Sequence, residues 1–122
     1  MNYLISFEKF KDIFKKMPVN SEFEFYFAGY KYTYSAIKYA DAVSFARCGY
    51  SKNMIKELGI RTDYIGSDEV FYASLDELTN SDLIDGINLF RDWNKITDIV
   101  VNGSFSIDQD IRELVEVYFK EI

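Results

Sequence analysis

The chain has 122 residues, of which 48% are hydrophobic and 18% aromatic, and its formal net charge at pH 7 is −6. This length corresponds to one domain of ordinary size, and the apolar content excludes a disordered chain. No apolar run approaches the roughly 20 residues that span a bilayer. The N-terminus lacks a signal-peptide pattern, and a single cysteine cannot form an internal disulfide, so we expect a cytoplasmic protein.

The first predicted element is an amphipathic helix over residues 6–17. Its apolar residues recur at intervals of three and four, as they do on one face of a helix: Leu4, Phe7, Phe10, Ile13, Phe14 and Met17. Ser6 suits the N-cap position. Pro18 ends the helix, because a proline biases the residue before it away from helical backbone.

Residues 22–48 contain three runs of alternating side chains, which is the pattern of β-strands. In the first run three phenylalanines share one face, since successive strand residues point to opposite sides: Phe23, Phe25 and Phe27. Ala28-Gly29 provides a turn. The third run extends from Ala42 to Cys48. The sequence therefore predicts an antiparallel meander.

The second run places three tyrosines on one face of its strand: Tyr30, Tyr32 and Tyr34. Alternation alone leaves open which face of the sheet they occupy. On the phenylalanine face they belong to the core. On the opposite face they form an exposed aromatic ladder that suits protein binding.

The remaining chain contains shorter predicted elements. They are a helix over Ser51–Leu58, a loop over Ile60–Asp68 or alternatively a short strand around Tyr64-Ile65, a strand over Glu69–Ala73, helical turns from Leu75 and over Ser81–Asp85, a further turn within Ile87–Lys95 anchored by Trp93, a strand over Thr97–Val101 and a helix from Ser106 to Ile122. We expect a single α+β domain over residues 1–122. It has a mostly antiparallel sheet of four or five strands, with the N- and C-terminal helices packed on one face.

The sequence lacks recognisable catalytic equipment. It contains no histidine, the commonest general base and transition-metal ligand. One cysteine excludes Cys-rich zinc sites, and no phosphate-binding glycine motif occurs. Neighbouring carboxylates have simpler explanations in helix capping and turns: Asp108 with Asp110, Asp82 with Asp85 and Asp68 with Glu69. We expect no enzyme activity, no cofactor and no metal.

Charge is distributed unevenly along the chain. Residues 57–122 contain fifteen Asp or Glu and five Lys or Arg, whereas residues 1–56 contain five and nine. Dispersed basic residues in an acidic protein argue against direct nucleic-acid binding. Acidic residues outside the main predicted helices are the candidate partner-binding residues, together with the three tyrosines: Asp63, Asp68, Glu69, Asp76, Glu77, Asp82 and Asp85.

These features favour a protein that acts by binding another protein. An acidic surface can compete with nucleic acid for a basic enzyme. The chain is rich in Phe, Tyr, Ile, Asn and Lys but has one Pro and six Gly, a bias that AT-rich codons produce and that fits a low-GC bacterium or its phages. In size, acidity and this residue bias it resembles phage and mobile-element anti-defence proteins, including anti-CRISPR inhibitors. The alternatives are a structural or adaptor module that binds through an aromatic sheet face, and an immunity protein against a basic toxin. We expect a monomer or a homodimer.

Overall fold

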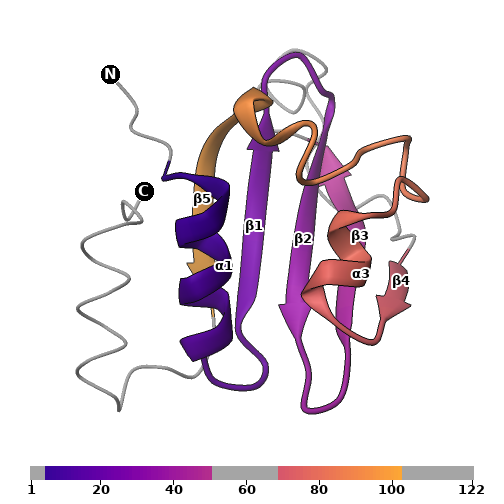
Figure 1. Cartoon of the computed structure of the whole chain (residues 1–122). Helices are drawn as coiled ribbons and strands as arrows, with labels where there is room; N and C mark the ends of the chain where they lie inside the picture. The colour runs from indigo at the N-terminus through magenta and orange to yellow at the C-terminus, as the bar shows by residue number, and fades with distance from the viewer. Residues whose placement is uncertain (1–4, 51–68, 103–122) are drawn as a thin grey trace.

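The computed structural model describes residues 5–50 and 69–102 (Figure 1). In chain order the elements are helix α1 (Phe7–Lys16), strands β1 (Glu22–Phe27), β2 (Tyr32–Lys38), β3 (Val43–Tyr50) and β4 (Glu69–Tyr72), helix α3 (Leu75–Thr79), the 3₁₀ turn η1 (Trp93–Lys95) and strand β5 (Ile96–Asn102). The helices predicted over residues 51–58 and 106–122, and the loop over 60–68, lie outside the described residues.

The five strands form one antiparallel sheet in the order β4-β3-β2-β1-β5. Strands β1 to β4 follow one another as a meander, and β5 then returns to pair with the other side of β1. Glu24 of β1 consequently lies between Ser35 of β2 and Val100 of β5. The predicted α+β fold and its antiparallel sheet are confirmed.

Helix α1 begins and ends where the sequence predicts. The Ser6 hydroxyl accepts a hydrogen bond from the Lys9 amide at 3.1 Å, and Met17 is the C-cap before Pro18. At this end Lys38 of β2 donates from Nζ to three main-chain carbonyl groups, those of Phe14, Lys15 and Met17, at 2.8–3.1 Å. The Phe14 carbonyl also accepts from the Met17 amide at 3.3 Å. Because carbonyls at the C-terminal end of a helix have few partners within it, these bonds from Lys38 link the end of α1 to the sheet.

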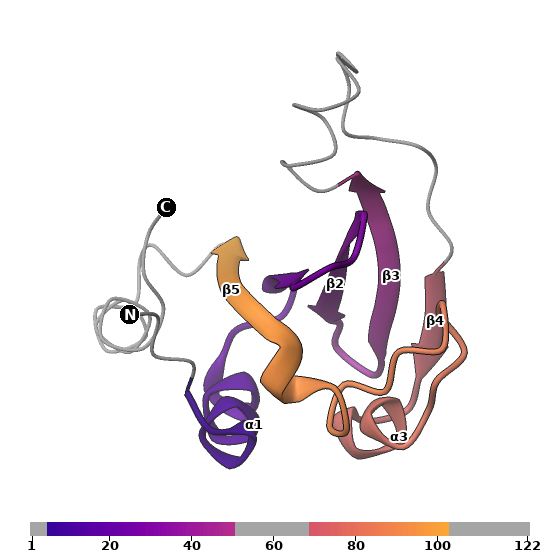
Figure 2. The same ribbon diagram turned by 90° about the horizontal axis from the view of Figure 1, so that it is seen from above.

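Both described helices lie on the same face of the sheet (Figure 2). Phe10 of α1 is fully buried there, and its ring centroid lies 5.1 Å from that of Phe23, 5.7 Å from that of Phe25 and 4.9 Å from that of Trp93. Burying a side chain of this size stabilises a fold by about 1.5–3 kcal/mol. The α1 stripe and the phenylalanine face of β1 thus meet as one aromatic core, and Trp93 belongs to it as predicted.

The register decides the position of the tyrosines. Tyr34 pairs with Phe25 and Ala36 pairs with Phe23, and directly opposed residues of an antiparallel pair share a face. Tyr34 is 1% exposed, while Tyr30 and Tyr32 are half-buried and pack against the core. The tyrosines therefore lie on the phenylalanine face and do not form an exposed ladder.

A long connection leads from β4 back to β5 across the helical side. Ser74 is the N-cap of α3, and its hydroxyl accepts from the Glu77 main-chain amide at 3.2 Å. A Glu77 carboxylate oxygen reaches back to accept from the main-chain amide of Ala73, the residue before the N-cap, at 3.1 Å. The helical turn predicted over residues 81–85 is instead a β-turn. Asp85 and Gly86 have positive φ values of 52° and 72°, which a right-handed helix cannot accommodate.

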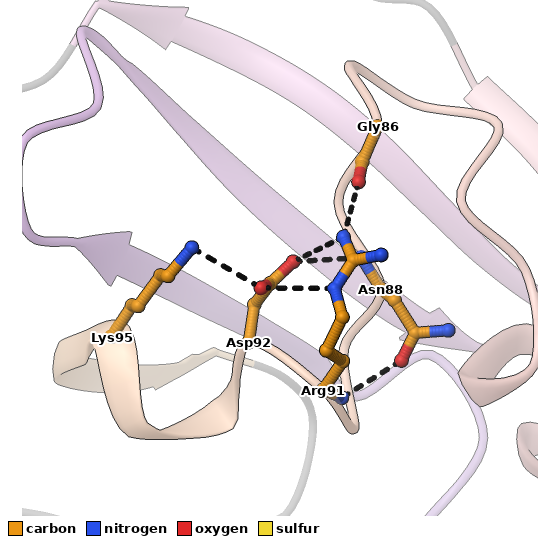
Figure 3. A network of polar contacts seen from close by, with 5 residues as sticks. All are labelled: Gly86, Asn88, Arg91, Asp92 and Lys95. Carbon is orange, nitrogen blue, oxygen red and sulfur yellow. Dashed lines mark hydrogen bonds and ion pairs between the residues drawn. The ribbon is translucent and has the colours of Figure 1, made fainter.

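Asp92 holds the rest of this connection together (Figure 3). Its carboxylate is buried and accepts hydrogen bonds from the Arg91 guanidinium at 2.9 and 3.2 Å and from the Asn88 amide at 3.0 Å, with Lys95 Nζ at 3.3 Å. Arg91 also donates to the Gly86 carbonyl at 2.7 Å. Through these contacts the Asp92 carboxylate links Asn88, Arg91 and Lys95, and Arg91 extends the network to Gly86.

Among the described residues, no helix is both long enough and apolar enough to cross a membrane. The same part of the chain has no group of three or more Cys, Asp or Glu side chains that could hold a metal ion.

Candidate functional site

The second face of the sheet, opposite α1 and α3, is covered by none of the described segments (Figure 2). We call it the open face. Strand alternation and the register assign its residues. They are Glu22, Glu24 and Tyr26 of β1, Thr33, Ser35 and Ile37 of β2, Ser44, Ala46 and Cys48 of β3, Glu69 and Phe71 of β4, and Asp98 and Val100 of β5.

The charges on the open face are all negative. Three strands contribute carboxylates, and none of the strand residues that the structure assigns to this face is a lysine or an arginine: the carboxylates are Glu22, Glu24, Glu69 and Asp98. Every described basic residue of the strands lies on the covered side, as Lys38 and Arg47 do. The open face is thus a coherent negative surface, although the chain as a whole contains fourteen basic residues.

The carboxylates of the open face influence the pKa of the Cys48 thiol. Burial raises its pKa above the ordinary value, and repulsion from three carboxylates, Glu22, Glu24 and Glu69, acts in the same direction. A hydrogen bond from Sγ to the Ser35 hydroxyl at 2.9 Å opposes the rise in pKa. Carboxylates on β1 and β4, which are not neighbouring strands, therefore both raise the pKa of Cys48 on β3. The thiol stays protonated at neutral pH.

Small side chains occupy the centre of the open face and are buried: Thr33, Ser35, Ser44 and Ala46. The side chains around them are larger and partly or fully exposed. Larger side chains able to contact a partner therefore surround this centre, and three of the carboxylates lie at strand ends or on edge strands: Glu22, Glu69 and Asp98.

The edge strand β4 adds an apolar feature. Phe71 is 59% exposed, and its ring centroid lies 5.7 Å from that of Tyr39 in the hairpin between β2 and β3. The Tyr39 hydroxyl donates to a Glu69 carboxylate oxygen at 3.4 Å. An exposed carboxylate and two aromatic rings thus stand side by side at one border of the open face.

The acidic residues chosen from the sequence are divided by the structure. Asp63 and Asp68 lie outside the described residues, and Glu69 lies on the open face. The other four, which are Asp76, Glu77, Asp82 and Asp85, belong to α3 and the segment after it, on the covered side of the sheet. The structure therefore does not join Glu69 and these four residues into one surface.

Three of those four carboxylates have partners within the chain. Asp76 lies 3.2 Å from Lys11 Nζ, and Glu77 accepts from the Ala73 main-chain amide at 3.1 Å. Asp85 accepts from the Tyr34 hydroxyl at 2.7 Å and from Arg47 Nη1 at 3.1 Å. Asp82 is exposed. Binding a partner through the first three would compete with contacts that stabilise the fold.

The predicted tyrosines take part in the same internal network. Burial, reinforced by the hydrogen bond to Asp85, raises the pKa of Tyr34 well above its ordinary value, so its hydroxyl remains a donor. Arg47 lies 5.0 Å from the ring centroid of Tyr32, and Tyr30 packs against Tyr34. Tyr34 offers no surface to a partner, and Tyr30 and Tyr32 offer only part of theirs.

Sequence reasoning missed most of the residues that the structure brings together on the open face. Glu22 and Glu24 alternate with buried phenylalanines, and that signal was sufficient to place them on the opposite face. Adding Asp98 and Glu69 to the same face required the strand order. Tyr39 and Phe71 are adjacent only because the β2–β3 hairpin lies beside β4.

Comparison of the chain with protein-family models, curated protein sequences and solved structures gave no match. A functional assignment therefore depends on the chemistry of the open face itself.

Proposed function

We propose that this protein is a non-enzymatic inhibitor that binds the basic surface of a nucleic-acid-binding enzyme through its open face. One observation carries the proposal: carboxylates from β1, β4 and β5 share a face whose described strand residues include no lysine or arginine. Charge complementarity of this kind accelerates association and selects the partner.

The dimensions of the open face suit contact with a folded protein. Neighbouring strands lie about 4.8 Å apart, so the distance from β5 to β4 is roughly 19 Å. Carboxylates spread over that width can pair with several basic side chains at once, as phosphates do. A partner that uses those basic side chains to hold nucleic acid cannot use them for both ligands, and the result is competitive inhibition.

Two further features support binding rather than catalysis. The chain contains no histidine to act as a general base. Asp85, which belongs to one of the carboxylate pairs considered for catalysis, already accepts hydrogen bonds from Tyr34 and Arg47.

The decisive experiment compares two variants with the same net charge. E22Q/E69Q/D98N neutralises three open-face carboxylates, and D12N/D41N/D82N neutralises three exposed carboxylates elsewhere. The partner is first captured from nuclease-treated lysate of a low-GC bacterium. It is then purified and assayed for nucleic-acid binding in the presence of each variant.

Wild type should displace nucleic acid from the purified enzyme. The open-face variant should do so about tenfold or more less effectively, and the control variant about as well as wild type. Raising the salt concentration should weaken the wild-type complex, because screening acts on exposed charges. If both variants lose the same amount of inhibition, or if the complex does not weaken as salt is raised, the open face is not the binding surface.

An immunity protein against a basic toxin nuclease would use the same chemistry, and the identity of the purified enzyme separates the two. An adaptor acting through the tyrosines is less well supported, because Tyr34 is 1% exposed and bound to Asp85.

A further inference from the structure

The border of the open face at β4 combines groups that recognise one particular side chain. We infer that Glu69, Phe71 and Tyr39 form a binding site for an arginine side chain of a protein partner. The inference rests on the proposed function, because it names the residue type that the acidic surface selects.

The constellation is an exposed carboxylate beside two aromatic rings. Glu69 and Phe71 are two residues apart on one face of β4, so their Cβ atoms lie roughly 7 Å apart. The Tyr39 ring is tilted by 40° against the Phe71 ring at a centroid distance of 5.7 Å. Its hydroxyl contacts Glu69 at 3.4 Å, a long hydrogen bond that leaves much of the carboxylate accessible.

Elsewhere in the chain, an aromatic ring and a carboxylate together bind an arginine side chain. On the covered side Arg47 lies over the ring of Tyr32 at 5.0 Å and donates to Asp85 at 3.1 Å, so its guanidinium has an aromatic face and a carboxylate as partners. Glu69, Phe71 and Tyr39 present the same two kinds of partner. No described lysine or arginine forms an ion pair with Glu69.

Arginine fits this site better than lysine for geometric reasons. Its planar guanidinium can stack on an aromatic ring while its N–H groups pair with both carboxylate oxygens, and it is more weakly hydrated than an ammonium group. Lysine offers a strongly hydrated point charge, which gains less from the ring. The site therefore adds a preference for arginine to the general attraction of the open face for cations.

The test uses two acetylated peptides of equal length, a glycine–arginine repeat and its glycine–lysine counterpart. Titration of ¹⁵N-labelled protein reports both affinity and location from the amide shifts of Glu69 and Phe71 and from the Phe71 ring protons. The arginine peptide should bind about two- to fivefold more tightly than the lysine peptide and should shift these signals.

Three variants make the test specific. Phe71→Leu keeps every charge and an apolar side chain, and it should reduce the ratio of the two affinities to about one; Tyr39→Leu should lower the ratio in the same direction. Phe90→Leu is the matched control, because Phe90 is 60% exposed and belongs to the connection after α3. It should leave the ratio unchanged.

Equal binding of both peptides by wild type, or an unchanged ratio in Phe71→Leu, would overturn the arginine site. Either result leaves the enzyme inhibition assay unaffected, because other open-face carboxylates can act without it. Conversely, a peptide preference that depends on Phe71, in a protein that inhibits no enzyme, would sustain the site and reject the inhibitor function.

Discussion

Asp92 is the one carboxylate residue that is buried in the described part of the fold. Its buried oxygens order a connection that has little regular structure of its own (Figure 3). The hydrogen bonds from Arg91, with further contributions from the Asn88 amide and Lys95, lower the pKa of Asp92 to about 2, against the opposing effect of burial. A carboxylate whose pKa is lowered by folding stabilises the folded state at pH values where it is ionised.

Asp92→Asn should therefore lower the free energy of unfolding at pH 7 by about 1–2 kcal/mol. The contribution of Asp92 is complete above the pKa of the unfolded chain, near 3.8, and is lost as the pH falls toward about 2. Urea titrations at several pH values should show the difference between wild type and variant shrinking over this range. Asp82→Asn, at an exposed position, is the control and should behave as wild type does.

At the scale of single elements, α1 shows how a distant side chain completes a helix. The carbonyls of Lys15 and of the C-cap residue Met17 would need other partners if Lys38 of β2 did not donate to them, and the Phe14 carbonyl would keep the Met17 amide. The ammonium group also lies 5.9 Å from the Phe14 ring centroid. Burial lowers the pKa of Lys38, but three hydrogen bonds to main-chain oxygens keep the charged form in place.

Lys38→Met should consequently lower the free energy of unfolding by about 1–3 kcal/mol, because it removes three charge-assisted hydrogen bonds and retains the apolar stem. Hydrogen exchange should show the largest loss of protection in the last turn of α1. Lys16→Met removes an exposed charge from the same turn and should cost much less. Equal effects of the two substitutions would mean that Lys38 acts only through its charge.

The elements were largely predictable because their signals are local. The α1 stripe, the alternation in β1 and the N-cap of α3 each need only a few consecutive residues. The turn at Asp85 and Gly86 was predicted as helical, although Asp-Gly is a local signal for a turn with two positive φ values. The bond from Tyr34 to Asp85, 51 positions away, has no such local signal. The face of the tyrosines likewise depended on the β1–β2 register, which alternation does not specify.

For the molecule as a whole, surface charge follows the sheet and not the sequence. The acidic second half of the chain suggested one interface, but the strand order places Glu22 and Glu24 from the first half on the same face of the sheet as Glu69 and Asp98 from the second. The sequence therefore predicted that the candidate site is acidic, but it did not identify most of the residues that form it. A linear sequence does not contain the contacts between strands that define a face.

Repulsion among the carboxylates of the open face should lower the free energy of unfolding. The variant E22Q/E69Q/D98N should raise the thermal midpoint at low salt by about 2–4 °C relative to wild type, with the difference fading as salt increases. The control D12N/D41N/D82N should shift the midpoint less, because Asp12 lies near Lys11. Calorimetry over a series of salt concentrations measures both. A lower midpoint for the open-face variant would show that its carboxylates stabilise the fold through other contacts.

The place of β5 in the sheet has a consequence during synthesis. Strands β1 to β4 are synthesised before Ile96–Asn102 exists, so β1 spends that interval with one side unpaired. An unpaired strand edge is a template for pairing with another chain. The nascent protein is thus most vulnerable to aggregation just before its last described strand is made, and a chain that terminates before residue 96 never passes that stage.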